Sequence, residues 1–334
     1  MFTPRRIDTI DTHTDGEPTR VITNWIKDIP GATTAEKMFF FKENYDHIRT
    51  TLMKEPRGHK DMYGCLLTKP SHEGSDYGII FMDNMSYMSM CGHGTIGVAT
   101  VIAEQGLVAI EEPLTRIVLE PPAGIVVANV RMRNGRAESV SFINVPAFVE
   151  ELDASLEVPG IGKIKVDIAF GGNYFVFYSA KNLGIKVVPE NIDLIIKTSM
   201  RIMEAANNRF TVSHATLMNN NHINIATILA DPRNKKADYL NIHVFSNGQY
   251  DRSSGGTATC ARLAVLHARG QLKVEEEIWV EGPTGGIFKG KILDETTVGN
   301  RKAIIPEITG TAYITGIHQF VINPGDVLKN GFLF

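Results

Sequence analysis

At 334 residues the chain is long enough for two domains of ordinary size, and a hydrophobic content of 43% is ample for packed cores, which excludes a disordered linker protein. The net charge is -3, and the charged residues, 21% of the chain, are interspersed in sign, so the sequence offers neither a basic face for nucleic acid nor a polybasic membrane patch. We therefore expect no nucleic-acid partner and no membrane partner.

The first residues, Met1 to Asp8, lack the apolar core of a signal peptide. No run approaches the roughly 18 apolar residues that a transmembrane helix needs. Three cysteines, Cys65, Cys91 and Cys260, are too few and too scattered for a disulfide framework, and none belongs to a Cys-x-x-Cys metal pair. We expect reduced thiols and a cytoplasmic protein.

Short strands dominate the pattern along the chain. Runs rich in β-branched and aromatic residues predict strands at 78–82, 117–119, 124–130, 174–178 and 223–228. Longer helical patterns cover 34–54 and 192–208, and we expect both helices to pack on the outside. Short strands with one helix of small residues in each half favour an α/β fold whose sheets wrap around a central helix.

Cys91 stands out among the candidate catalytic residues. Residues 89–97 read Ser-Met-Cys-Gly-His-Gly-Thr-Ile-Gly and open a helical pattern that ends at Gly106. Unpaired amide N–H groups at a helix start stabilise a thiolate, which acts as a base or a nucleophile. The alternative is that Cys91 is only a small buried apolar residue. Its glycine-rich flanks favour the catalytic interpretation.

The chain also resembles itself. The run 91–95, which continues to Gly106, has a counterpart in 255–259, which continues to Gly270 at the same spacing. Two further pairs of segments match in the same order. The turn at 120–124 is similar to the turn at 281–285, and the upstream run 11–16 is more weakly similar to 167–172. Three matches in one order indicate two similarly folded halves.

We place the first half, which carries Cys91, at 1–160, with the C-terminal tail 315–334 able to return to it. The second half is placed at 161–314 and carries the loop 251–257. In this arrangement we expect the two glycine-rich helix starts to face each other across a cleft.

Several long motifs match a known family. They are 11–20 (DTHTDGEPTR), 55–59 (EPRGH) with 62–64 (MYG), 90–94 (MCGHG), 170–173 (FGGN), 251–253 (DRS) and 304–310 (IIPEITG). On these residues the chain resembles the proline racemase family over almost its whole length, in a pattern similar to the proline racemases of anaerobic bacteria. The family also contains hydroxyproline 2-epimerases and trans-3-hydroxy-L-proline dehydratases.

The resemblance implies a diaminopimelate-epimerase-like α/β fold with two pseudo-symmetric halves, each a β-barrel-like sheet around a central helix, and an active site between them. It also implies a small imino-acid substrate, no cofactor, no metal and commonly a homodimer. In family racemases two cysteines face opposite sides of the substrate α-carbon, and by position Cys91 is the first of them, the proton acceptor. By the same resemblance, Gly92, His93 and Gly94 cradle the substrate carboxylate, a role that N–H groups at a helix start suit.

In the second loop, Asp251 matches the family carboxylate that pairs with the imino nitrogen. Gly256 and Thr257 match the second carboxylate-binding loop. Family racemases read Asp-Arg-Ser-Pro-Cys-Gly-Thr here, whereas this chain has Gly255 at the position of the second cysteine. The dehydratases carry threonine there, so the chain matches neither pattern.

Two nearby side chains are candidates to replace the missing thiol. Ser254 is either a substitute acid or a cap for the following helix. Cys260 lies five residues beyond Gly255, which at about 1.5 Å of rise per residue places it several Å too deep.

The missing thiol leaves the reaction open. Racemisation needs an acid opposite Cys91, whereas dehydration of trans-3-hydroxy-L-proline needs one base and a proton donor for the leaving hydroxyl, such as a water beside Gly255. A glycine there could also admit a bulkier substrate. A family member that only binds a proline-like ligand is the remaining alternative.

Other side chains are weaker candidates. His59, Tyr63 and His222 could approach the pocket, although lone histidines in a strand-rich enzyme are more often structural. His13, His59 and His93 lack the close spacing of a zinc site. No Gly-x-Gly-x-x-Gly run, the one at 92–97 included, directly follows a predicted parallel strand, so the glycine-rich loops do not indicate a dinucleotide.

Overall fold

The structure is a computed structural model that describes residues 5–24, 28–217 and 221–333. The chain divides into two compact units, Met1–Phe142 with Thr311–Phe334 (unit 1) and Ile143–Gly310 (unit 2). The strand β9 (Ala147–Val158), which the sequence-based boundary at 160 assigned to the first half, falls in unit 2, because it pairs with β10 (Gly162–Phe170) from end to end. Within the described residues, no helix is long and apolar enough to cross a membrane.

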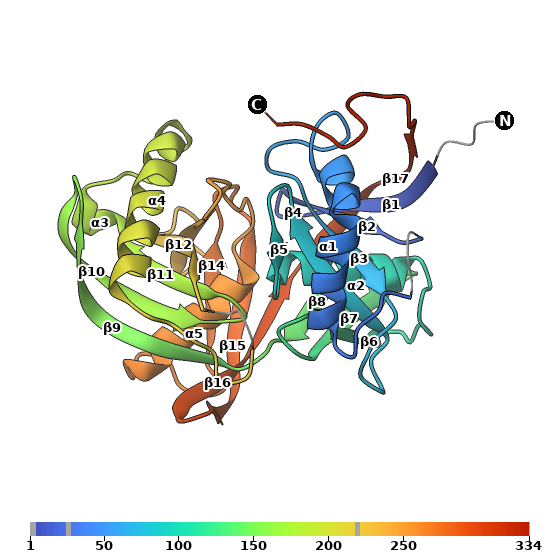
Figure 1. Cartoon of the computed structure of the whole chain (residues 1–334). Coiled ribbons are helices and arrows are strands. Elements are labelled where there is room, and N and C mark those ends of the chain that lie inside the picture. The colour runs from blue at the N-terminus through green and yellow to red at the C-terminus, as the bar shows by residue number, and fades with distance from the viewer. Residues whose placement is uncertain (1–4, 25–27, 218–220, 334) are drawn as a thin grey trace. The chain divides into compact units, whose positions relative to one another are not determined.

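Unit 1 is built on one mixed sheet, labelled in Figure 1. Its elements are β1 (Arg5–Thr14), β2 (Glu17–Ile22), α1 (Thr34–Met53), β3 (Tyr63–Thr68), β4 (Tyr77–Asp83), β5 (Tyr87–Met88), α2 (Gly92–Glu104), β6 (Leu114–Glu120), β7 (Val126–Arg133), β8 (Arg136–Ile143) and β17 (Ala312–Ile322). From β17 the sheet runs through β1, β2, β3, β4 and β6 to β7, and the two parallel pairs are β2–β3 and β4–β6.

Unit 2 contains a closed barrel of 8 strands. Besides β9 and β10 its elements are β11 (Tyr174–Ser179), α3 (Ala180–Leu183), the 3-10 turn η1 (Pro189–Asn191), α4 (Ile192–Arg209), β12 (Ile223–Ala230), β13 (Tyr239–Phe245), α5 (Gly256–Ala268), β14 (Glu277–Glu281), β15 (Ile287–Val298) and β16 (Arg301–Gly310). Each strand pairs with the next along the chain, and β16 returns to β9 to close the barrel.

The two units follow the same succession of strand directions. In unit 2 the parallel pairs are β11–β12 and β13–β14, at the steps where unit 1 has β2–β3 and β4–β6. By this correspondence the C-terminal strand β17 takes in unit 1 the place that β9 takes in unit 2. The predicted α/β fold of two pseudo-symmetric halves is confirmed.

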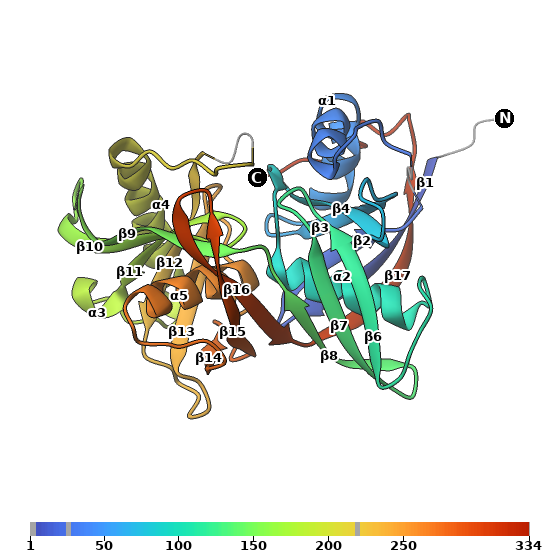
Figure 2. The ribbon, with the colours of Figure 1, turned by 90° about the horizontal axis from the view of Figure 1, so that it is seen from below.

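A helix of small residues lies inside each unit. Every residue from Gly92 to Ala103 of α2 and from Gly256 to Leu266 of α5 is buried (Figure 2). The small side chains let the surrounding strands approach closely. At Gly97, a β-carbon would lie 2.6 Å from Thr12 Oγ1 on β1, so only glycine fits there.

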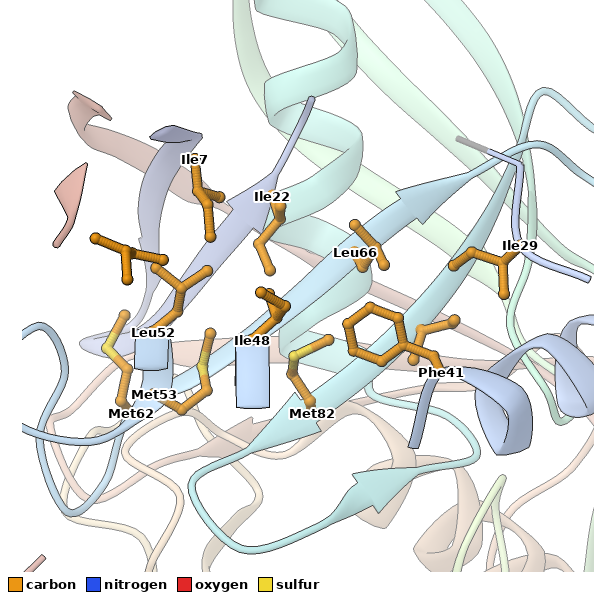
Figure 3. Close-up of a cluster of buried hydrophobic side chains, with 12 residues drawn as sticks. Ile7, Ile22, Ile29, Phe41, Ile48, Leu52, Met53, Met62, Leu66 and Met82 are labelled. Carbon is orange, nitrogen blue, oxygen red and sulfur yellow. The ribbon is translucent and has the colours of Figure 1, made fainter. Parts of the chain in front are cut away.

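The predicted strands and outer helices are confirmed, with helix α1 at Thr34–Met53 and α4 at Ile192–Arg209. One face of α1 packs against the sheet of unit 1 through the apolar cluster drawn in Figure 3. The helix contributes Phe41, Ile48, Leu52 and Met53, and β1, β2, β3 and β4 contribute Ile7, Ile22, Leu66, Ile80 and Met82. Burial of these side chains, each worth about 1.5–3 kcal/mol, holds the helix on the sheet.

The two charged residues at the ends of the motif 11–20, Asp11 and Arg20, form a buried ion pair. Arg20 Nη2 lies 2.8 Å from Asp11 Oδ2, and the two side chains are only 8% and 13% exposed. The other terminal nitrogen of Arg20 donates to the carbonyls of Leu52 and Arg57, at 2.6 Å each. Arg20 therefore ties the end of α1 and the segment after it to the sheet.

We expect Arg20→Met to lower the free energy of unfolding by about 3–5 kcal/mol, because it leaves the Asp11 carboxylate buried without its partner. Urea unfolding followed by circular dichroism measures this. Arg133→Met is the control, since Arg133 pairs with Glu138 at 2.7 Å but is 72% exposed, and its loss should cost less than about 1 kcal/mol. Equal losses in the two variants would contradict a structural role for the Asp11–Arg20 pair.

Candidate active site

Cys91 is the N-cap residue of α2. Its backbone is extended (φ -143°, ψ 122°), and its Sγ accepts a hydrogen bond from the Gly94 amide at 3.3 Å. Its carbonyl accepts from the Thr95 amide and hydroxyl, at 3.0 and 2.7 Å. The predicted position of the thiol at a helix start is confirmed.

Two aromatic side chains enclose the thiol. His93 Nδ1 lies 3.3 Å from Cys91 Sγ, and the rings of His93 and Tyr63 meet edge to face with centroids 4.7 Å apart. Burial, and then the neighbouring Cys91, raises the pKa of the Tyr63 phenol well above its usual range. Tyr63 is therefore protonated beside the sulfur. Of the three side chains that the sequence suggested near the pocket, Tyr63 is the one that reaches the Cys91 group.

The glycine at 94 is required by the packing around the sulfur. A β-carbon there would lie 2.8 Å from Phe81 Cε1 and 3.1 Å from Cys91 Sγ. Any side chain would therefore displace the thiol or the Phe81 ring. The Gly-His-Gly run thus serves both to supply the amide and to leave the sulfur its space.

The other two thiols differ from Cys91 in burial. Cys65 and Cys260 are fully buried, whereas Cys91 is 6% exposed. Burial raises the pKa of Cys65 well above its usual range and raises the pKa of Cys260 to about 12. Both therefore remain protonated thiols at neutral pH.

In unit 2, the loop before α5 is held by its own backbone and side chains. Asp251 Oδ1 accepts from the Ser253 amide at 2.7 Å, and Ser253 Oγ accepts from the Gly255 amide at 3.1 Å. The Asp251 amide donates to the His243 carbonyl at 2.9 Å, which ties the loop to β13. Asp251 and Thr257 are almost fully buried, at 5% and 7% exposed.

Gly255, the N-cap residue of α5, has a backbone that differs from that of Cys91. Its φ of +77° is disfavoured for residues with a side chain, and a β-carbon there would lie 2.0 Å from His243 Nε2. The chain therefore has glycine at the position of the second thiol for two physical reasons. On the side of Gly255 where a β-carbon would lie, the His243 imidazole fills the space.

Ser254 does not cap α5. The helix has no side-chain cap, and the Ser254 hydroxyl donates instead to the Gly286 carbonyl at 2.9 Å. The capping alternative is therefore wrong. Cys260 lies in the second turn of α5 with a fully buried side chain, deeper than Gly255.

The start of α5 is also fixed by the motif 170–173. A β-carbon at Gly171 would lie 2.3 Å from the Thr257 carbonyl oxygen and 2.6 Å from the Ala261 amide nitrogen. Gly171 thus lets the end of β10 lie directly against the first turn of α5. This contact positions the Gly256 and Thr257 amides at the helix start.

His59 and His222 are the other two side chains that the sequence suggested near the pocket. His59 and His222 are exposed, and His59 Nδ1 accepts from the Asp61 amide at 3.2 Å. Across residues 5–24, 28–217 and 221–333, no group of three or more His, Cys, Asp or Glu side chains is placed to hold a metal ion. The Cys91 group belongs to unit 1 and the 251–257 loop to unit 2.

Sequence reasoning missed His243. It lies in the middle of β13, where the alternation of apolar and polar residues predicts an outward-facing polar side chain, and no glycine-rich or helix-start signal marks it. The one available signal was a histidine between Ile242 and Val244 in a strand twelve residues before the missing cysteine. Only the fold brings it against Gly255.

Comparison with known proteins identifies the family to which this chain belongs. The family model described as "Proline racemase" matches residues 9–333. A proline racemase of Acetoanaerobium sticklandii is 46% identical over 327 residues, 98% of each chain, and a 4-hydroxyproline 2-epimerase of Streptosporangium roseum is 40% identical over 336 residues, 100% of each. The crystal structure of a hydroxyproline epimerase from Agrobacterium vitis with bound trans-4-hydroxy-L-proline matches with a TM-score of 0.92 at 30% identity, covering 99% of this chain and 96% of that one.

The chain belongs to the proline racemase family. It has the diaminopimelate-epimerase-like fold of that family, and its named relatives are isomerases. The helix-start thiol therefore sits in an enzyme of an isomerase family.

Iodoacetamide at pH 8 should alkylate Cys91 at least about tenfold faster than Cys65 or Cys260, because the thiolate is the nucleophile and the two buried thiols have raised pKa values. Peptide mass spectrometry of the folded protein measures the three rates. The Cys91→Ala variant should lose the fast phase and keep the slow ones. Fast labelling of Cys65 or Cys260 would contradict the assigned environments.

Gly255→Ala should cost about 2–5 kcal/mol of stability, since it combines a positive φ with a clash against His243. Gly285→Ala is the matched control, because Gly285 has a φ of +90° with open space beside it, and should cost only about 1–2 kcal/mol. In a His243→Ala background the Gly255→Ala cost should fall to that of the control. Thermal unfolding of the four variants measures the coupling, and a cost unchanged by His243→Ala would refute the clash.

Proposed function

We propose that this enzyme inverts the α-carbon of proline or a hydroxyproline, with Cys91 as the acceptor of the α-proton. The observation that carries the proposal is the Cys91 thiol at the start of α2, with the Gly94 amide directed at its sulfur, inside a family motif. The names of the relatives support the substrate class.

The α-proton of an imino acid is a very weak acid, so the negative charge that develops must be stabilised by oriented donors. We assign the backbone N–H groups of Gly92, His93 and Gly94 at the start of α2 to the substrate carboxylate. At the start of α5 we assign Gly255, Gly256 and Thr257 to the same carboxylate. Amides at a helix start lack intrahelical partners and bind anions, which supports the assignment of Gly92, His93, Gly256 and Thr257. The Gly94 and Gly255 amides also donate to Cys91 Sγ and Ser253 Oγ. We assign Asp251 to the ring nitrogen.

In this scheme a thiolate and backbone dipoles supply the chemistry, so the reaction requires neither a cofactor nor a metal. We expect the enzyme to be cytoplasmic and, as the family resemblance implies, a homodimer. Size-exclusion chromatography with light scattering measures the oligomeric state.

Dehydration of trans-3-hydroxy-L-proline is the second candidate function. The observation that favours it is Gly255, because a site with one thiol can remove the α-proton and expel a β-hydroxyl without a second thiol. A protein that binds a proline-like ligand without turnover is the third outcome of the test.

We expect proton NMR in D2O to show inversion of L-proline or trans-4-hydroxy-L-proline at the α-carbon, with deuterium incorporated there. The Cys91→Ala variant should lose at least about 1,000-fold in inversion rate, as expected for removal of an acid-base group in a two-base reaction. Trans-3-hydroxy-L-proline is tested in parallel.

Each outcome of this experiment is distinct. Loss of water from the 3-hydroxy substrate alone would replace the isomerase proposal with the dehydratase. The absence of both inversion and exchange with all three compounds would refute catalysis on these substrates. Full activity of Cys91→Ala would refute Cys91 as the proton acceptor.

A further inference from the structure

The His243 imidazole lies against the α-carbon of Gly255, on the side where a side chain would begin. A β-carbon at position 255 would lie 2.0 Å from Nε2, 2.4 Å from Cδ2 and 2.8 Å from Cε1 of this ring. The imidazole therefore occupies the volume that the first side-chain atom of a cysteine would take. Its Nε2 is an acid-base group at the site of the missing thiol.

The ring is held at both nitrogens. Thr227 Oγ1 lies 2.9 Å from Nδ1, and the Ser254 carbonyl oxygen lies 3.2 Å from Nε2. Thr227 and His243 face each other across the β12–β13 pair, so the hydroxyl holds the ring from the barrel wall. The Thr227 hydroxyl oxygen can accept from Nδ1–H, and in that arrangement Nε2 loses and regains a proton beside Gly255, its protonated form donating to the Ser254 carbonyl.

We propose that His243 is the second acid-base group of this enzyme, acting through Nε2 in place of the second family cysteine. The inference rests on the proposed function and completes it with a named proton donor. It accounts for two features together, the glycine at 255 and the buried histidine in an apolar strand.

The proton balance closes with these two groups. In one direction the Cys91 thiolate takes the α-proton, the C–H bond breaks, and the His243 imidazolium donates its Nε2 proton to the opposite face of the same carbon. This leaves a thiol and a neutral imidazole. In the reverse direction the imidazole takes the α-proton of the other isomer and the thiol returns one, so no co-reactant is consumed.

The alternatives to His243 are less suited to proton transfer. The Ser254 hydroxyl already donates to the Gly286 carbonyl inside unit 2, and burial holds Cys260 as a thiol with its pKa raised to about 12. Burial lowers the pKa of His243, and the neighbouring Asp251 acts in the opposite direction. The neutral imidazole is therefore the resting form at neutral pH, which is the form that accepts a proton.

The test uses His243→Gln, whose side-chain amide can still donate to the Ser254 carbonyl but cannot transfer protons. Ser254→Ala is the matched control, and Cys91→Ala removes the opposite base. Proton NMR in D2O measures inversion and α-deuterium exchange separately for the L and D isomers of proline and trans-4-hydroxyproline. Circular dichroism checks that each variant is folded.

We expect His243→Gln to lose inversion at least about 100-fold, the usual range for an acid-base group, while Ser254→Ala stays within about fivefold of wild type. We expect His243→Gln to exchange the α-proton of one isomer only and Cys91→Ala that of the other only. This split by stereochemistry is the signature of two opposed bases. A purely structural role would slow exchange of both isomers together.

Inversion by His243→Gln at the wild-type rate would overturn the inference and leave the proposed function intact, as would an equal loss of exchange with both isomers. If wild type instead dehydrates the 3-hydroxy substrate, loss of dehydration in His243→Gln but not in Ser254→Ala supports His243 as the donor to the leaving hydroxyl. Retained dehydration overturns it. A wild-type enzyme without any turnover overturns the inference together with the proposed function.

Discussion

The enclosure of a helix start inside a sheet is the constraint on which this structure depends. A helix leaves its first amides without partners, and when the helix is buried on every side those amides must meet an anion, a side chain or a bound molecule. In unit 1 the partner of the Gly94 amide is the Cys91 sulfur. The enclosure also demands small residues, which is why Gly97 can lie against Thr12 of β1. One geometric requirement thus explains both the glycine content and the placement of the thiol.

The duplication gives the two units the same framework and different helix starts. At the start of α2, Cys91 has an extended backbone and caps the helix through its sulfur, whereas at the start of α5, Gly255 has a positive φ and caps nothing. In unit 1 the thiol belongs to the loop itself, whereas in unit 2 the His243 imidazole reaches Gly255 from the neighbouring strand. A thiol paired with an imidazole carries a different total charge from a pair of thiols that share one proton. With His243 as the proposed second acid-base group, we expect the enzyme to share the family fold and to differ in the total charge of its two acid-base groups.

The part of the candidate site that the sequence predicted is the part whose residues lie close together along the chain. Cys91, His93 and Gly94 lie within four residues, so a glycine-rich run before a helical pattern sufficed to find them. Tyr63 reaches the His93 ring from β3, about thirty residues earlier, and this contact depends on how the strand packs on α2. Of the two alternatives for Ser254, the helix cap is not formed, since α5 has no side-chain cap and the hydroxyl donates to the Gly286 carbonyl.

The sequence by itself indicated the two-fold plan, the central helices, the outer helices and the position of Cys91 at a helix start, because periodicity, glycine placement and internal similarity are encoded along the chain. It also placed a glycine at 255, in the loop that corresponds to the Cys91 loop. Only the tertiary structure decided which side chain lies against Gly255. His243 comes to Gly255 through the pairing of β12 with β13 and the return of the 251–255 loop onto β13, contacts between residues that no spacing rule connects. Likewise, only the barrel closure of β16 on β9 set where the second unit begins, since a strand joins the sheet that offers its edge a partner.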